Sequence, residues 1–196
     1  MDGVLANTPD MIYKHLKEHG YEITNNEYHA KLKGCDGKEI VMDFINDLFT
    51  NRMDEVGENK EYQENVMKEI DIVADVTIVT ARRPKFCEGT RDWLTKHFPD
   101  TKMDLIFLSS SDKPSFVKEH GFHAFVEDRL RTANTAARMG INTYLMTHPW
   151  NMGRPIHEKV TRINSLSTFQ SLLATVSHKF TNKNDCDIIE KQHTLC

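Results

Sequence analysis

The sequence has few cysteines and no long apolar run, and each shortage excludes a class of protein. Its 196 residues include four cysteines, none of them in a Cys-x-x-Cys pair. A zinc site or a disulfide framework is therefore not expected, and the thiols should be reduced. The chain also lacks a run of about eighteen apolar residues, the length that predicts a membrane-spanning helix. Asp2 stands where a secretory signal would carry positive charge, so the expected location is the cytoplasm.

Positive charge is also in short supply. Lysine and arginine number 25 against 29 aspartates and glutamates, which gives a formal net charge of −4. Proteins that bind nucleic-acid polymers usually carry a basic surplus instead. A small anionic substrate is still compatible with this balance, because a single pocket can be locally positive. The expected partner is thus a small phosphomonoester, with no nucleic-acid polymer and no membrane, and a homodimer is left open.

Helical periodicity dominates the first part of the chain and then gives way to alternation. Apolar residues recur at helical spacing in three segments, near residues 9–19, 40–49 and 62–70. From residue 76 onward, short apolar runs alternate with amphipathic segments, which predicts a parallel, doubly wound sheet. The expected strands are Val76–Thr80, Leu105–Leu108, Ala124–Val126 and Thr143–Met146, with a further short one at 160–163.

These patterns divide the chain into an α/β core and a helical insertion. The core comprises residues 1–8 and 72–177, and residues 9–71 are expected to form a helical cap on the carboxyl side of the sheet. Residues 178–196 are polar and have no periodicity, which predicts a disordered tail.

Chemistry in an open α/β sheet is expected beyond the carboxyl ends of the strands. At those positions the sequence has a hydroxyl, cations and carboxylates, the groups needed to hold a phosphoryl group and a divalent cation. The candidates are Asp2, Thr80, Ala81, Arg82, Lys113, Glu127 and Asp128. Adjacent carboxylates at a strand end suit Mg²⁺, which takes one or two of them and keeps several waters.

Several of the candidates also have an ordinary structural explanation. Taken alone, Glu127 and Asp128 are better explained as a helix-capping acid and its surface neighbour. Lys113 could be a solvated lysine at a helix start, although the helix dipole disfavours a cation there and so favours a phosphate role. Three aromatic residues of the cap could stack on a base but are more simply explained as core, namely Phe44, Phe49 and Tyr62. The functional interpretation depends on the order and spacing of the whole set.

The same residues resemble four motifs in the order found in the haloacid dehalogenase superfamily. Met1-Asp2-Gly3-Val4-Leu5-Ala6 is similar to the end of the first motif, and Val79-Thr80-Ala81-Arg82 to the second. Lys113 resembles the third motif and Val126-Glu127-Asp128-Arg129 the fourth. Thr147-His148-Pro149-Trp150-Asn151 resembles a loop of the 5'(3')-deoxyribonucleotidase family and its bacterial and phage relatives.

The resemblance covers about residues 1–175 and implies a Rossmann-like phosphatase core with a helical cap inserted after the first motif. It implies Mg²⁺-dependent removal of phosphate from nucleoside or deoxyribonucleoside monophosphates. In this chemistry an aspartate takes the phosphoryl group as an aspartyl-phosphate, and a second aspartate two residues later acts as general acid and then base. Asp2 matches the second aspartate, and its backbone carbonyl would also reach the metal.

The other matched positions divide between metal and phosphate. Glu127 matches the direct metal ligand and Asp128 its neighbour, and the choice between them as inner-sphere ligand stays open. The positions that match the phosphate-binding motifs are Thr80, Ala81, Arg82 and Lys113. These side chains would hold the phosphoryl oxygens while the metal neutralises charge.

The first motif departs from the family pattern. The nucleophile would lie one position before Met1, and the central strand that precedes it in the family is missing. There are two explanations, a start placed too late and a natural loss of catalysis. The intact register of the other motifs favours the first. We expect a gap between the strands ending at Thr80 and Val126, and no hydrolysis by the chain as written. The alternatives are a non-catalytic nucleotide- or phosphate-binding relative and a phosphatase for a non-nucleotide substrate.

Overall fold

The computed structural model describes residues 1–20, 37–59 and 63–177. Within these ranges the chain forms seven α-helices, two short 3₁₀ helices and five strands. Every strand pairing is parallel, so the fold is α/β, as the sequence predicts. No helix in these ranges is both long and apolar enough to cross a membrane. The predicted tail at 178–196 and the cap residue Tyr62 lie outside the described residues.

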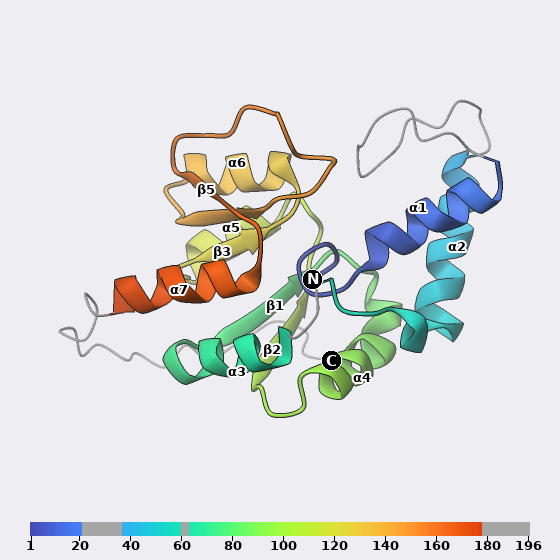
Figure 1. Cartoon of the computed structure of the whole chain (residues 1–196), viewed down its shortest axis with the longest axis horizontal. Helices are drawn as coiled ribbons and strands as arrows, with labels where there is room; N and C mark the ends of the chain where they lie inside the picture. Colours follow the sequence, from blue (N-terminus) through green and yellow to red (C-terminus); the bar gives the residue numbers. More distant parts are fainter. Residues whose placement is uncertain (21–36, 60–62, 178–196) are drawn as a thin grey trace.

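The strands fall into two sheets. β1 (Val76–Thr80) pairs with β2 (Met103–Phe107) in the first sheet. β3 (Phe125–Glu127), β4 (Thr143–Met146) and β5 (Val160–Ile163) form the second sheet in that order. The expectation of one continuous sheet is therefore wrong, whereas the expected gap between β1 and β3 is present: in the described part of the chain no strand lies between them (Figure 1).

Helices cover the second sheet closely. α6 (Leu130–Arg138) packs on β3 and β4 and also contacts α5 (Lys113–Glu119). The face of α6 toward the sheet carries small, fully buried residues, Ala133, Ala136 and Ala137, which let the helix approach the strands closely. α7 (Leu166–Ser177) follows β5 and packs back on it.

The predicted cap range divides between two places. α1 (Thr8–Glu18) and α2 (Gly37–Asn51) pack against each other, whereas α3 (Gln63–Val73) packs along α7 (Figure 1). α2 also contacts α4 (Cys87–His97), which follows the 3₁₀ helix Pro84–Phe86. α1 and α2 are thus the helices of this range that stand beside the strand ends.

Cys87, the first residue of α4, is disulfide-bonded. The expectation of reduced thiols is therefore wrong for this residue. Its partner lies outside the described residues, and no short spacing in the sequence relates Cys87 to another cysteine.

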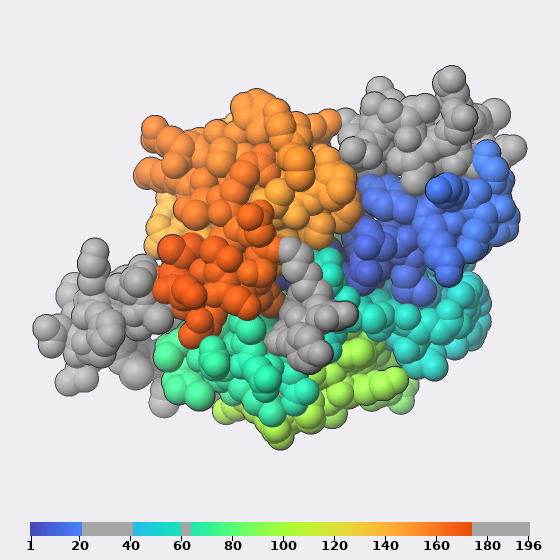
Figure 2. Space-filling view, in the orientation of Figure 1, coloured from blue at the N-terminus to red at the C-terminus, as the bar shows by residue number. Residues whose placement is uncertain are grey.

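The first residues form a tight loop next to the strand ends. The Met1 carbonyl accepts hydrogen bonds from the backbone N–H groups of Val4 (3.1 Å), Leu5 (2.8 Å) and Ala6 (3.2 Å). Gly3 adopts φ +74°, a conformation that is unfavourable for residues with a Cβ. In the space-filling view residues 1–20 lie between α2 and the segment that follows β4 (Figure 2), so this loop joins the helical insertion to the core.

Candidate functional site

A pocket of about 290 Å³ lies where β1 and β3 end and the N-terminal loop begins. It is lined by all seven residues that the sequence singled out: Asp2, Thr80, Ala81, Arg82, Lys113, Glu127 and Asp128. They come from the N-terminal loop, the end of β1, the start of α5 and the end of β3. Parallel strands bring their carboxyl ends to one edge, which is why residues so distant in the sequence meet here.

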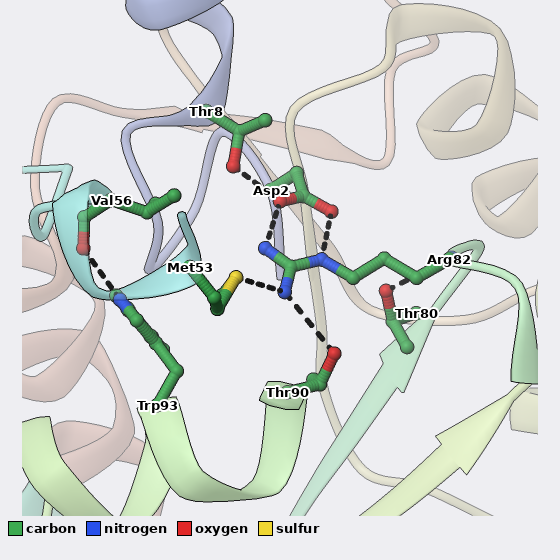
Figure 3. A network of polar contacts seen from close by, with 8 residues as sticks. All are labelled: Asp2, Thr8, Met53, Val56, Thr80, Arg82, Thr90 and Trp93. Atoms are coloured by element: carbon green, nitrogen blue, oxygen red, sulfur yellow. Dashed lines mark hydrogen bonds and ion pairs between the residues drawn. The ribbon is translucent and has the colours of Figure 1, made fainter. Parts of the chain in front are cut away.

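Asp2 forms a bidentate ion pair with Arg82 (Figure 3). Arg82 Nη2 donates to Asp2 Oδ1 at 2.6 Å and Arg82 Nε donates to Oδ2 at 3.1 Å. The Thr8 hydroxyl donates a further hydrogen bond to Oδ1 at 2.6 Å. Thr8 is the first residue of α1, after the N-cap residue Asn7, so this contact ties the start of the helix to the site.

The Arg82 guanidinium is enclosed on its other sides as well. Its Nη1 donates to the Thr90 hydroxyl at 3.2 Å and contacts the Met53 sulfur at 3.3 Å. Its central carbon lies 4.0 Å from the centre of the Phe49 ring, within range for a cation–π contact. The backbone N–H of Arg82 donates to the Thr80 hydroxyl at 3.3 Å. Arg82 was predicted to bind phosphate, and in this structure its side chain holds Asp2.

Electrostatics keep Asp2 ionised. Burial alone would raise the pKa of Asp2, but the charge and hydrogen bonds of Arg82 outweigh burial and hold its pKa well below the usual range. An ionised carboxylate can accept a proton and so serve as a base. Acting as an acid would require Asp2 to gain a proton first, which the contact with Arg82 opposes.

Lys113 and Glu127 form a second buried ion pair. Lys113 Nζ donates to Glu127 Oε2 at 3.2 Å, and the two side chains are 7% and 4% exposed. Glu127 Oε1 accepts the backbone N–H groups of Asp128 (3.2 Å) and Arg129 (3.1 Å). Burial opposes ionisation of Glu127, but the nearby Lys113 charge and these hydrogen bonds lower its pKa to about 2. Both oxygens of Glu127 therefore have partners within the protein.

Asp128 has the opposite environment. Its Oδ2 is buried and has no hydrogen-bond partner in the described residues. Burial, and then the charge of Glu127, raise the pKa of Asp128 above its usual range. Gly3 packs directly against this carboxyl, so that a Cβ built on Gly3 would overlap Asp128 Oδ2 and lie 2.7 Å from its Cγ. Both the φ of Gly3 and this contact require glycine at that position.

The loop after β4 holds the acidic pair and the N-terminal loop in place. Asn151 is fully buried, and its side-chain amide donates to the carbonyls of Asp128 and Met146, each at 2.8 Å. His148 Nε2 donates to the Gly3 carbonyl at 2.5 Å, and its ring stacks on Trp150 with centres 4.1 Å apart. This loop is the one that resembles a loop of the 5'(3')-deoxyribonucleotidase family, and its contacts hold the neighbouring segments in position.

The donor set suits a magnesium ion better than a metal held by many protein ligands. No group of three or more His, Cys, Asp or Glu side chains is arranged around a metal position in the described parts of the chain. Mg²⁺ needs only one or two carboxylates and completes its shell with water and substrate phosphate. The unpartnered Asp128 Oδ2 is a hard oxygen of this kind, so the residues present fit the ion.

The rest of the pocket wall comes from the helical insertion and from further residues of the core, which are Met1, Arg83, Phe86, Ser110 and Arg129. Apolar side chains of α1 and α2 face the pocket together with one carboxamide; the lining residues are Ile12, Met42, Ile45, Asn46 and Phe49. On the core side Arg129 Nη1 donates to the Ser110 hydroxyl at 2.6 Å, and both residues line the pocket. Phe44, a predicted candidate for base stacking, instead stacks on His15 with centres 4.0 Å apart. Asn46 was not predicted as a pocket residue, although the sequence contains a sign of it, since it is one polar residue within an apolar helical face.

Comparison with known proteins gives similarity in structure but not in sequence. No protein family and no curated protein matches the sequence. A haloacid dehalogenase-like family hydrolase from Xanthomonas campestris is similar with a TM-score of 0.49 and 11% identity, over 86% of this chain and 66% of the hydrolase. A dehalogenase has a TM-score of 0.48 and 15% identity, over 84% of this chain and 79% of its own length. RSP, a Rex-family repressor, has a TM-score of 0.31 and 10% identity, over 89% of this chain and 90% of the repressor. The chain thus spans just under two thirds of the Xanthomonas hydrolase.

Proposed function

We propose that the pocket is a Mg²⁺-dependent phosphomonoesterase site that removes phosphate from nucleoside monophosphates. The observation that carries this proposal is the convergence of seven residues, chosen from sequence motifs alone, in a single pocket at the strand ends. Within it a buried ammonium, two buried carboxyls and a hydroxyl stand together, which is the set of groups that phosphoryl transfer requires.

The phosphate-binding part would be built on Thr80 and Lys113. The Thr80 side chain is 1% exposed and Lys113 is 6% exposed, so both are held in one place. A preorganised cation and a hydroxyl stabilise charge that develops on phosphoryl oxygens without rearranging during the reaction. Lys113 is now paired with Glu127 at 3.2 Å, and the incoming phosphate would share its ammonium.

For the metal, we propose Asp128 as the direct ligand and Glu127 as the residue that orients the site. Glu127 already has partners at both oxygens, whereas Asp128 Oδ2 has none among the described residues. The bound ion would neutralise charge on the transferring phosphoryl group. The Asp2 backbone carbonyl is the further ligand that the resemblance suggests.

The nucleophile in this proposal is an aspartate directly before Met1. Burial and Lys113 lower the pKa of the Met1 amino group, while Asp2, Glu127 and Asp128 act in the opposite direction. Met1 itself lines the pocket, so a residue directly before it would lie among the phosphate and metal groups. Its carboxylate would attack phosphorus as the bond to the nucleoside oxygen breaks. Asp2 would first have to take up a proton from solvent, once substrate phosphate has drawn Arg82 away, and would then give that proton to the leaving oxygen. Asp2 would then take a proton from the water that releases phosphate from the aspartyl-phosphate.

A second candidate is a nucleotide- or phosphate-binding protein without turnover. The observation that favours it is the bidentate Arg82 contact, which holds Asp2 ionised and so opposes its action as an acid. For turnover, substrate phosphate would have to draw Arg82 away from Asp2.

Phosphate release from a panel of nucleoside monophosphates separates these candidates. Two proteins are compared, the 196-residue chain and the same chain preceded by roughly six apolar residues and an aspartate, about the length of a short strand. We expect release only from the longer protein and only with Mg²⁺. Binding without release by both proteins would support the non-catalytic candidate. Full activity in excess chelator would exclude the magnesium role, and release from sugar phosphates but not nucleotides would exclude the substrate class.

A further inference from the structure

One face of α2 is directed at the pocket. Met42, Ile45, Asn46 and Phe49 all line it, and their spacing of three and four residues places them on the same side of the helix. Three of them are apolar, and Asn46 is the only carboxamide among the described residues that line the pocket. The groups proposed for phosphate and metal come from the strand ends and the start of α5 instead. The side chains that α2 contributes to the pocket are therefore mainly apolar, whereas those from the strand ends are mainly polar.

The side-chain oxygen of Asn46 is left without a partner. Asn46 Oδ1 is buried and accepts no hydrogen bond from any described residue. The neighbouring Asn51, on the same helix, is by contrast exposed and donates to Asp47 at 2.8 Å. A buried carbonyl oxygen without a donor is unfavourable and rare in folded proteins. Because Asn46 is one of the residues that line the pocket, we take a bound ligand as the source of the missing donor.

We infer that Asn46 is a specificity-determining residue that recognises the hydrogen-bonding edge of a nucleobase when the phosphate lies at Thr80 and Lys113. This inference rests on the proposed function and names the part of the substrate that α2 contacts. Side-chain amides pair with the edge of a base through one acceptor and one donor. The apolar side chains of Met42, Ile45 and Phe49 beside it match the flat, weakly polar faces of such a ring.

The alternative donor for Asn46 Oδ1 is a hydroxyl of the sugar. A sugar phosphate has these hydroxyls but no base, so comparison of the two ligands separates the assignments. The pocket offers apolar surface around Asn46, and a sugar in that position would leave its other hydroxyls without partners. A base leaves fewer polar groups unpaired, which favours the base.

Binding to the 196-residue chain tests the inference without requiring turnover. Affinities are measured by titration calorimetry in Mg²⁺ for nucleoside 5'-monophosphates carrying each of the four bases and for ribose 5-phosphate. We expect at least one nucleotide to bind more tightly than ribose 5-phosphate. Asn46→Leu should weaken that nucleotide by about 5- to 10-fold, the usual effect of one hydrogen bond, and leave ribose 5-phosphate unchanged. The matched control Asn51→Leu should change neither affinity.

A second measurement uses the wild-type protein alone, in case the leucine variant does not fold. The preferred nucleotide is compared with an analogue whose ring N–H or amino group is methylated, so that the donor is lost. Weaker binding of the analogue is expected, and equal binding would overturn the inference. So would an Asn46→Leu variant that keeps the nucleotide affinity or loses both affinities equally. Failure of the wild type to bind either ligand would remove the proposed function and this inference with it.

Discussion

Replacing Arg82 with methionine tests how the protein holds Asp2 in its ionised form. Methionine keeps most of the length and apolar bulk of the arginine side chain but removes the guanidinium. The substitution would remove both hydrogen bonds that Arg82 donates to Asp2. Among the described residues, only the Thr8 hydroxyl would remain as a side-chain partner of the carboxylate.

The expected loss of stability follows from the burial of the pair. Removing one partner of a fully buried ion pair costs ~3–5 kcal/mol, because the other charge is left buried without compensation. The Arg82 side chain is 1% exposed, but that of Asp2 is 17% exposed. Water can therefore relieve part of the penalty at Asp2, and we expect a loss of about 3 kcal/mol in the free energy of unfolding at pH 7.

The loss should also depend on pH. In the wild type the pKa of Asp2 is lowered, so its contribution to stability is complete above the ordinary value of 3.8 and is lost as the pH falls below it. In Arg82→Met burial acts without Arg82, so the pKa of Asp2 should lie above the ordinary value. Protonation then removes the penalty in the variant, and the difference between the two proteins should shrink from pH 7 to about pH 4.

Urea denaturation followed by circular dichroism at both pH values measures these differences. Arg83→Met is a matched control, because Arg83 is the next residue along the chain and is exposed. The double variant Asp2→Asn/Arg82→Met should be more stable at pH 7 than Arg82→Met alone. The reasoning would be refuted if Arg82→Met lost no more stability than Arg83→Met, or the same amount at both pH values.

Three further changes test the acidic pair and its supports. Gly3→Ala should lower the free energy of unfolding by about 1–3 kcal/mol, because alanine is strained at φ +74° and its Cβ would overlap Asp128. Gly57→Ala is the control and should not lower it, because nothing lies within 4 Å of a Cβ at that position. Asn151→Ala should lower the free energy of unfolding by a similar ~1–3 kcal/mol, because it leaves buried carbonyls unpaired. A melting temperature equal to that of the wild type would contradict this prediction. The stability that Glu127 contributes should be complete above about pH 5 and be lost as the pH falls toward its pKa of about 2. Glu127→Gln should therefore make the free energy of unfolding, measured by urea titration, depend less on pH between pH 5 and pH 3. An unchanged pH dependence in this variant would contradict the prediction.

The order of the motifs predicted the composition of the pocket because strand ends are readable from sequence. Thr80, Lys113 and Glu127 each stand where an apolar strand gives way to a loop or helix start, and parallel pairing then brings these positions to one edge. The same reasoning placed Asp2 beside them. Periodicity also indicated the parallel direction of two pairings, because α4 joins β1 to β2 and α6 joins β3 to β4 as helical crossovers. β4 and β5 are joined by a described segment without a helix, so their parallel pairing did not follow from this pattern.

Contacts between distant side chains could not be read in the same way. Arg82 was assigned to phosphate, yet its guanidinium is held by Asp2, Thr90 and Met53, and no pattern along the chain relates these positions. The position of α3 along α7, apart from α1 and α2, was equally hidden. An amphipathic helix shows that it has an apolar face but not which surface covers it.

The rate of phosphate release by a Lys113→Ala variant is the most direct test of the central claim, that this pocket carries out phosphoryl transfer. The measurement uses the protein extended upstream by an apolar strand and an aspartate, with the preferred nucleoside monophosphate and Mg²⁺. Lys118→Ala is the matched control, because Lys118 lies on the same helix and is exposed. We predict that kcat/KM falls by ~10² to 10³ in Lys113→Ala, the typical effect of removing one charge-stabilising donor, and is unchanged in Lys118→Ala. Turnover near that of the wild type in Lys113→Ala would contradict the assignment of the pocket.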